Sequence, residues 1–357
     1  MVAQAPAAEP AETVTEEAPE TPAAPAPVLS TPKISGFVDA TYNYNTRDPM
    51  SGLTAYHSYT AQHDTVLLNA AHLALTGTGA DEAIAYAIEL DVGSDAAVNS
   101  GDDDVDLQEA WFAYTSKTGL GLKAGKFVTF SGIEVIESIA NPTISRGHLF
   151  GLAECFTHAG VLLTYKRDEL DAAFGVVNGW DVVKDNNDGK TLAAKVGYTT
   201  ASYLATLSGY AGPEQPAEGP LDSENIRLSG DLTGMVKVGP VDLWAQVNAG
   251  SEEGASAVME GETARWVGAG LQPVWHVLER LALGARAEVF SDRQGARTGT
   301  PQTLYNLTLA PAFTIVSGLV VRGELRYDHS NKLVFEDSEA VTHQDQVLAL
   351  TEAVYSF

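Results

Sequence analysis

The stretch Leu319–Asp328, which reads LVVRGELRYD, decides the fold. Its odd-numbered positions are apolar, aromatic or glycine, whereas the even-numbered positions after Val320 carry arginine, glutamate, arginine and aspartate. Neighbouring residues of a β-strand point to opposite faces of a sheet, so an alternation with period two predicts a strand. We therefore expect Leu319–Asp328 to form a strand with one apolar face and one charged face.

The same alternation recurs along the chain. It is clear at Leu281–Phe290 and at Asn225–Thr233, and in Val241–Ala249 it places Trp244 on the same face as Gln246. Repeated segments of this kind, each bounded by turn residues, predict an antiparallel β-protein. We expect about sixteen strands, near residues 34–44, 65–76, 82–92, 104–115, 120–128, 156–166, 169–178, 190–199, 202–210, 223–236, 240–250, 262–272, 280–290, 303–314, 318–329 and 344–357.

Every second connection between these segments is short, as at Gly77–Ala80, Ser116–Gly119 and Arg167–Asp168, and the longest of the others spans 129–155. Short periplasmic turns that alternate with long external loops are typical of outer-membrane barrels. The chain contains no run of about twenty apolar residues, which a transmembrane helix needs, and its mean hydropathy is −0.05. We therefore predict an all-β fold, a closed antiparallel transmembrane β-barrel of about 16 strands.

Both ends of the chain fit this prediction. Residues 1–32 are largely Ala, Pro, Glu and Thr, and cannot bury enough apolar surface to offset the entropy of ordering. We expect 1–32 to be a disordered periplasmic tail and 33–357 to be the outer-membrane β-barrel. Ala3–Ala5 resembles the end of a cleavage site, so we expect a signal peptide to be removed or absent from this chain. Tyr355–Phe357 fits an outer-membrane insertion signal.

The chain is strongly acidic, with a net charge of −26 and an isoelectric point near 4.5. Such a surface repels phosphate backbones, so we expect no nucleic-acid partner. Acidic loops can attract cations at a pore mouth or share divalent ions with lipopolysaccharide; alternatively, they only keep exposed loops soluble. We expect outer-membrane lipid and lipopolysaccharide as partners, and the barrel-assembly machinery during insertion.

Charged residues on an inward face need either water or a partner, and about sixteen strands enclose an aqueous channel. The strand residues expected to line it are Arg227, Arg265, Arg286, Glu288, Arg322, Glu324 and Arg326. The third external loop, 129–155, contributes Glu134, Glu137, Arg146, His148 and Glu154. We expect this loop to fold into the lumen, where its acids oppose the arginines and create a transverse field along the solute path. The alternative is that these charges pair with one another and hold the loop in place.

Nothing in the sequence indicates catalysis or metal binding. His158 has no recognisable Ser or Asp partner motif, so we expect it to form structural hydrogen bonds. The eight histidines lack metal-ligand spacing, and Asp102–Asp106 lacks the glycine and glutamate of a calcium-binding loop. Cys155 is the single cysteine, so no intrachain disulfide is expected. We predict no enzymatic activity, no metal ion and no cofactor.

Several short motifs between residues 125 and 161 carry a resemblance to a known family. They are Gly125-Lys126-Phe127, Glu134-Val135-Ile136-Glu137, Asn141-Pro142, Ser145-Arg146, Leu149-Phe150-Gly151 and Phe156-Thr157-His158-Ala159-Gly160-Val161. Together they resemble the OmpL-like beta-barrel porin family. The resemblance implies a porin-like outer-membrane channel, without a named substrate.

We accordingly expect passive diffusion of small hydrophilic solutes or ions through the barrel. The alternative is a plugged barrel that acts as an anchor or as a binding protein through its tail or its acidic loops. A homo-oligomer and a periplasmic partner of the tail are also left open at this point.

Overall fold

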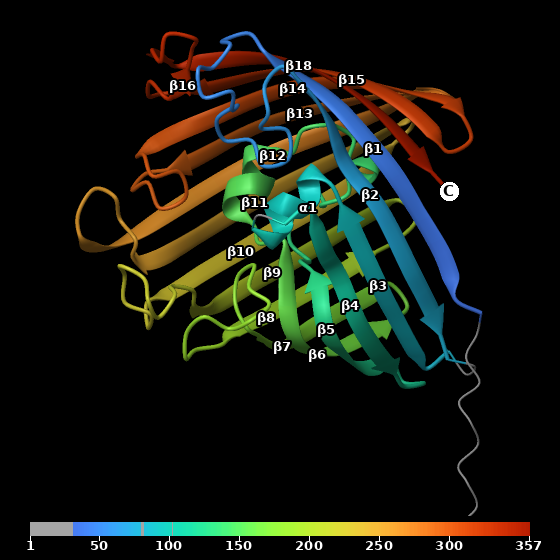
Figure 1. Cartoon of the computed structure of the whole chain (residues 1–357). Helices are drawn as coiled ribbons and strands as arrows, with labels where there is room; N and C mark the ends of the chain where they lie inside the picture. Colours follow the sequence, from blue (N-terminus) through green and yellow to red (C-terminus); the bar gives the residue numbers. More distant parts are fainter. Residues whose placement is uncertain (1–30, 80–81, 102) are drawn as a thin grey trace, which may run out of the picture.

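Sixteen strands close into one antiparallel barrel in the computed structural model, which describes residues 31–79, 82–101 and 103–357 (Figure 1). Each strand pairs with its neighbours in chain order, and β1 pairs with β18 to complete the ring. The predicted fold class and strand number are confirmed. The predicted tail, 1–32, lies outside the described residues except for its last two positions.

The barrel strands agree with the predicted segments to within a few residues, the largest difference being the end of β12, at Leu278 rather than near 272. They are β1 (Lys33–Asn45), β2 (Thr65–Thr78), β3 (Ile84–Val92), β4 (Val105–Thr115), β5 (Leu120–Val128), β6 (Thr157–Arg167), β7 (Leu170–Val177), β8 (Thr191–Thr199), β9 (Tyr203–Pro213), β10 (Ile226–Val238), β11 (Val241–Gly254), β12 (Gly261–Leu278), β13 (Leu281–Asp292), β14 (Gln302–Val316), β15 (Leu319–Ser330) and β18 (Asp345–Ser356).

Five short elements lie in the long connections. They are α1 (Ser94–Ser100), η1 (Ser138–Ala140), η2 (Leu149–Ala153) and the hairpin of β16 (Phe335–Glu336) and β17 (Thr342–His343). None of the helices within the described ranges is long and apolar enough to cross a bilayer.

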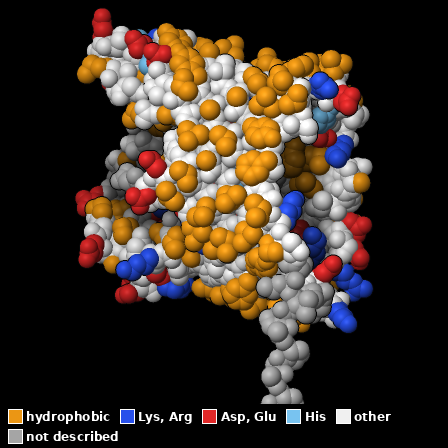
Figure 2. All heavy atoms as spheres, turned by 45° about the vertical axis from the view of Figure 1, so that its right-hand side comes forward, with side chains coloured by type: hydrophobic (Ala, Val, Ile, Leu, Met, Phe, Trp, Pro, Cys, Tyr) orange, Lys and Arg blue, Asp and Glu red, His pale blue; other side chains and the backbone are white. Residues whose placement is uncertain are grey.

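The predicted alternation of faces is present on β15. Leu325 is 58% exposed on the outer face, whereas Arg322, Glu324 and Arg326 are buried. Figure 2 shows the consequence for one side of the molecule, where hydrophobic side chains cover the middle of the barrel wall and charged ones gather near its margins. An apolar outer face is what a lipid environment requires, since closure of the ring already satisfies the backbone of every strand.

The two halves of the barrel differ in strand length. Strands β3 to β8 contain between 8 and 11 residues, whereas β10 to β15 contain between 12 and 18. The taller half provides the inward surface on which the longest connection packs.

Candidate functional site

The connection between β5 and β6, residues 129–156 and here named L3, contacts inward-facing side chains of the taller half. Its helix η2 lies within the outline of the barrel in Figure 1 and packs against β11 and β12. Leu149 and Ala153 of η2 form an apolar cluster with Trp266, Phe290 and Leu304 of the strands. Apolar packing therefore fixes one end of L3 against the wall.

Glu134 of L3 forms a hydrogen-bonded ion pair with Arg286 of β13. Its carboxylate accepts hydrogen bonds from Arg286 Nη1 at 2.6 Å, Gln272 Nε2 at 2.9 Å and the Gly147 amide at 2.6 Å. Arg286 Nη1 also donates to the Ser145 carbonyl at 2.6 Å. Both charged groups are buried, so each compensates the desolvation of the other.

Three further charged residues of β15 bind the backbone of L3. Arg322 donates to the Asn141 carbonyl at 2.6 Å, and Arg326 donates to the Arg146 carbonyl at 2.7 Å. Glu324 accepts a hydrogen bond from the Ile144 amide at 2.6 Å. These contacts satisfy backbone groups that a buried irregular segment would otherwise leave unpaired.

Glu288 and His148 extend this set of contacts toward the first external loop. Glu288 accepts a hydrogen bond from the His148 amide at 2.8 Å. His148 Nε2 lies 3.3 Å from Asp328 Oδ1, without hydrogen-bond geometry. His57, from the connection after β1, reaches Asp328 Oδ2 at 3.1 Å. Burial, followed by the charge of Arg326, lowers the pKa of His57 to about 3, so this ring is neutral at physiological pH.

Glycines let L3 approach the wall closely. A Cβ atom at Gly284 of β13 would collide with the Pro142 carbonyl, and one at Gly268 of β12 would collide with Leu149. On the L3 side, a Cβ atom at Gly147 would collide with the Glu288 carboxylate. The fit between L3 and β12–β13 therefore depends on the absence of side chains at these positions.

Glu154, near the end of L3, lies close to a second acidic residue, Asp231. Its carboxylate accepts a hydrogen bond from Gln246, which also donates to Asp231 at 2.7 Å. The second oxygen of Glu154 has no hydrogen-bond partner among the described residues. Burial, followed by the charge of Asp231, raises the pKa of Glu154 well above its ordinary range.

Arg146 is buried within L3 rather than facing a solute path. It donates to the Ile144 carbonyl at 3.1 Å and to the Ile136 carbonyl, and lies 3.7 Å from Asp95 of α1. Its guanidinium also stacks 4.6 Å from the ring centroid of Tyr59. These contacts tie L3 to the first and second external connections.

Two predicted arginines lie apart from L3. Arg227 forms a bidentate ion pair with Glu252 of β11, at 2.8 and 3.0 Å. The prediction that Arg265 faces inward is wrong. Its neighbours Ala264 and Trp266 are buried on the inner face of β12, so strand parity places Arg265 outside, where it is exposed.

A cavity of about 350 Å³ lies on the other side of L3, between L3 and the inward faces of β8 to β11. The strands contribute Lys195, Leu204, Thr206, Thr233 and Trp244, and L3 contributes residues 129–137, Phe150 and Phe156. The parity of Val241–Ala249 had placed Trp244 inside, and Trp244 does line this cavity. L3 is hydrogen-bonded to the wall on both sides of this cavity, because Ser131 Oγ also lies 2.7 Å from Ser208 Oγ of β9 and the Gly132 amide donates to Asp231 of β10 at 3.3 Å.

Charged residues near this cavity were missed by the sequence reasoning, which considered inward charges only on the late strands. Lys195 lines the cavity and pairs with Asp171 at 2.6 Å. Glu137, one of the residues predicted from the sequence, also lines it and accepts a hydrogen bond from Gln108. Lys123 of β5 stacks on Trp111, with Nζ 4.0 Å from the ring centroid. Inward parity on β5 and β8 was the signal that could have identified both lysines.

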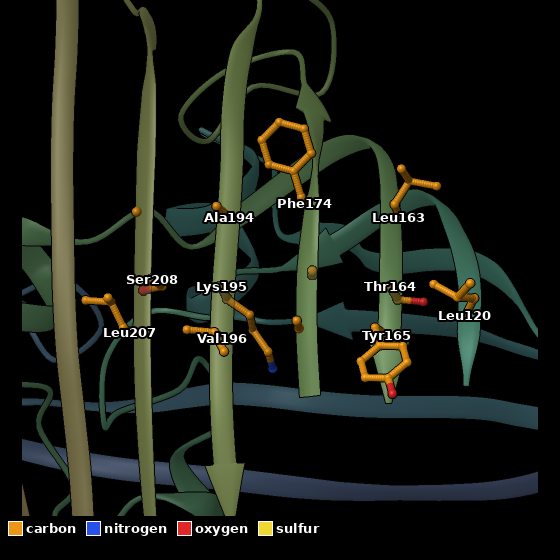
Figure 3. Close-up of a pocket in the computed structure, with 13 residues that line it drawn as sticks. Leu120, Leu163, Thr164, Tyr165, Phe174, Ala194, Lys195, Val196, Leu207 and Ser208 are labelled. Atoms are coloured by element: carbon orange, nitrogen blue, oxygen red, sulfur yellow. The ribbon is translucent and has the colours of Figure 1, made fainter. Parts of the chain in front are cut away.

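A concavity of about 680 Å³ is a groove on the outside of the barrel over β6 to β9. Figure 3 shows Leu163, Phe174, Val196 and Leu207 on these neighbouring strands, and all four side chains are exposed. Their outward parity places the groove on the lipid-facing side, away from the solute path.

His158 and Cys155 make the contacts expected of structural residues. His158 Nδ1 lies 3.1 Å from the Gly179 carbonyl and Nε2 lies 3.1 Å from Cys155 Sγ. Both residues are buried. Across the described ranges, no group of three or more His, Cys, Asp or Glu side chains is arranged to hold a metal ion.

Over residues 32–357 the sequence matches the family described as putative beta-barrel porin-2, OmpL-like. The chain belongs to this family. The OmpL-like porin is thus an outer-membrane channel protein, as the motifs of residues 125–161 predicted. The comparison with curated protein sequences returned no match.

Solved porin structures share the fold of the OmpL-like porin at low sequence identity. The anion-selective porin from Comamonas acidovorans matches with a TM-score of 0.66 and 12% identity, over 92% of this chain and 99% of that one. The trimer form of OmpT from Vibrio cholerae matches with a TM-score of 0.64 and 12% identity, over 92% and 99%. The outer-membrane channel DcaP of Acinetobacter baumannii matches with a TM-score of 0.62 and 14% identity, over 91% and 97%.

Proposed function

We propose that the OmpL-like porin is a passive diffusion channel for small hydrophilic solutes, and that the solute path runs between L3 and the inward faces of β8 to β11. The cavity of about 350 Å³ at this place carries the proposal. Opposite it, hydrogen bonds such as that between Glu134 and Arg286 join L3 to the wall, and the cavity that remains between L3 and β12 to β18 is smaller, about 160 Å³. We propose that the arginines of β13 and β15 hold L3 in place, while the solute passes on its other face.

Single-channel conductance of the purified protein in planar bilayers tests this proposal. We expect discrete steps in potassium chloride, and we expect Thr206→Trp to reduce them several-fold, because Thr206 lines the cavity. The matched control is Thr351→Trp, since Thr351 lies on the outer face of β18 and is exposed. Equal conductance of the two variants would place the path elsewhere, and complete absence of steps would refute the channel.

The second candidate function is a plugged barrel that serves as an anchor or binding protein. The number of buried contacts between L3 and the wall favours it, since Arg286 alone donates to Glu134, Thr143 and Ser145. A protein that inserts stably but never conducts would support this function. Capture of a periplasmic partner that is lost when residues 1–32 are deleted would identify the tail as the binding segment.

The membrane and the partners of the channel are proposed from the family to which the chain belongs. The family implies the bacterial outer membrane, and we propose lipopolysaccharide as the lipid in contact with its external rim and the barrel-assembly machinery as the route of insertion. The name of the OmpT structure includes a trimer form, and we propose a homo-oligomer here as well. Mass measurement of the detergent-solubilised protein would test the oligomer.

A further inference from the structure

The lining of the cavity combines apolar surface with both signs of charge. On the L3 side, Val135 is 38% exposed although it lies inside the barrel, and it adjoins Ile133. On the strand side, Leu204 and Trp244 face it. A path meant only for hydrated ions has no need of apolar side chains, whereas a solute with an apolar body would cover them and release water from both surfaces.

The charges of the lining lie on opposite sides of the cavity. Lys195 projects from β8, and its side chain remains partly exposed despite its ion pair with Asp171. Glu137 projects from L3 and forms no ion pair with any cation in the described part of the chain; its partner is the neutral amide of Gln108. Glu134, the remaining charged residue of the lining, is already neutralised by Arg286.

Further charged residues lie on β3, β4 and β5, outside the lining of the cavity. Glu109 of β4 accepts a hydrogen bond from the Val128 amide at 2.8 Å, and Glu89 of β3 pairs with it in register. Lys123 has no carboxylate within ion-pair distance among the residues that the structure describes, and it sits over the Trp111 ring instead. Glu109 also accepts a hydrogen bond from the Trp111 indole, so Glu109 and Lys123 contact the same ring. The separation of charge across the cavity therefore rests on Lys195 and Glu137.

We infer that the channel favours small zwitterions that carry an apolar side chain, a class that includes the hydrophobic α-amino acids. The carboxylate of the solute faces Lys195, its ammonium group faces Glu137, and its side chain lies against Val135, Leu204 and Trp244. A volume of about 350 Å³ falls at the lower end of the usual range for ligand pockets, about 300–1,000 Å³. This inference rests on the proposed function, because the solute must pass through the same cavity.

Swelling of proteoliposomes in four probe solutes separates the contributions of charge and of apolar surface to the rate of solute entry. L-phenylalanine, 3-phenylpropionate and phenethylammonium share one apolar body and differ in charge, whereas glycine has both charges and no apolar body. We expect phenylalanine to enter several-fold faster than either singly charged analogue. We also expect its rate relative to glycine to be higher than the difference in size between the two solutes predicts. Empty liposomes correct for direct passage through lipid.

Two charge-neutralising variants test the assignment of groups. We expect Lys195→Gln to shift the preference toward phenethylammonium and Glu137→Gln to shift it toward 3-phenylpropionate. The control is Lys237→Gln, because Lys237 lies near the periplasmic end of β10 and is exposed. Ordinary conductance in potassium chloride with no preference among the four probes would overturn the inference and leave the channel intact. Absence of any conductance would instead remove the proposed function itself.

Discussion

Single residues decide how L3 is held against the barrel wall. Arg286 is fully buried and is satisfied only because Glu134, Ser145 and Asn306 surround its guanidinium. A buried charge is tolerated when its partner is present, whereas loss of one partner leaves the other uncompensated in a medium of low polarity. The pair between β13 and L3 is therefore the contact whose removal should cost most.

We expect Arg286→Met to lower the free energy of unfolding by about 3–5 kcal/mol, the cost of leaving one member of a buried ion pair alone. Urea denaturation of the protein in lipid vesicles measures this value. Arg280→Met provides the control, because Arg280 is exposed at the turn between β12 and β13. Equal losses in the two variants would show that the buried pair contributes nothing specific.

The inward position of Arg286, Arg322 and Arg326 could be predicted from parity alone, because alternation is a local property of each strand. Their partners could not, since these depend on how L3 crosses the barrel. Arg265 shows the limit of parity: the residues after it, Trp266 to Gly270, are two larger apolar residues followed by three very small ones, with no alternation and no charge to fix the phase. The wrong assignment of Arg265 follows from that ambiguity.

At the scale of elements, L3 and the strands β12 and β13 fit together through glycine. Gly268 and Gly284 face inward and leave space that Leu149 and Pro142 occupy. A side chain introduced there cannot be accommodated by rotation, because the obstructing atom at Gly284 belongs to the backbone of L3. The segment would have to move toward β8 to β11, into the cavity.

We expect Gly284→Val to destabilise the protein by about 1–3 kcal/mol, as overpacking usually does, and to reduce the single-channel conductance because L3 is displaced into the cavity. Planar bilayer recordings and urea denaturation measure the two effects. Gly323→Val is the matched control, since a Cβ atom at Gly323 approaches its nearest neighbour, Pro311, only to 4.0 Å. Unchanged conductance of Gly284→Val would argue against a path beside L3.

The strands could be predicted and the short elements inside the connections could not. Alternation and turn residues lie within each segment, so β1 to β15 and β18 are visible in the sequence. The helices η1 and η2 are held by residues far away, such as Arg322, which donates to the Ser138 carbonyl at 2.9 Å across 184 positions. The charged residues of the late strands were expected to border the solute path. In the structure, Arg286, Arg322 and Arg326 instead form hydrogen bonds with L3.

At the scale of the whole molecule, we expect the barrel to stay closed without L3. Every strand has two hydrogen-bonded neighbours in the ring, and none of these pairs involves residues 133–152. Without L3, the charged groups of β13 and β15 would face water, which hydrates them in place of the lost partners.

We therefore expect replacement of residues 133–152 by a short Gly-Ser linker to leave the barrel folded and to increase its conductance several-fold. Resistance to unfolding by dodecyl sulfate at room temperature reports the barrel, and bilayer recordings report the conductance. Shortening residues 217–222, a largely exposed part of the connection between β9 and β10, is the control and should leave conductance unchanged. A variant that folds but conducts no better than the unmodified protein would contradict the assignment of L3 as the constriction.

The pairing of β1 with β18 has a consequence for the order of assembly. Phe37 lies opposite Ser356 and Asn45 lies opposite Leu348, so this seam joins segments separated by almost the whole chain, whereas most other pairs are hairpins between successive strands. Distant segments meet late, because the entropy lost on bringing them together falls only as the intervening hairpins form. Until then both margins of the growing sheet keep unpaired amide and carbonyl groups, which lipid cannot satisfy. Closure of this seam is therefore the step at which a nascent barrel most needs shelter from the hydrocarbon around it.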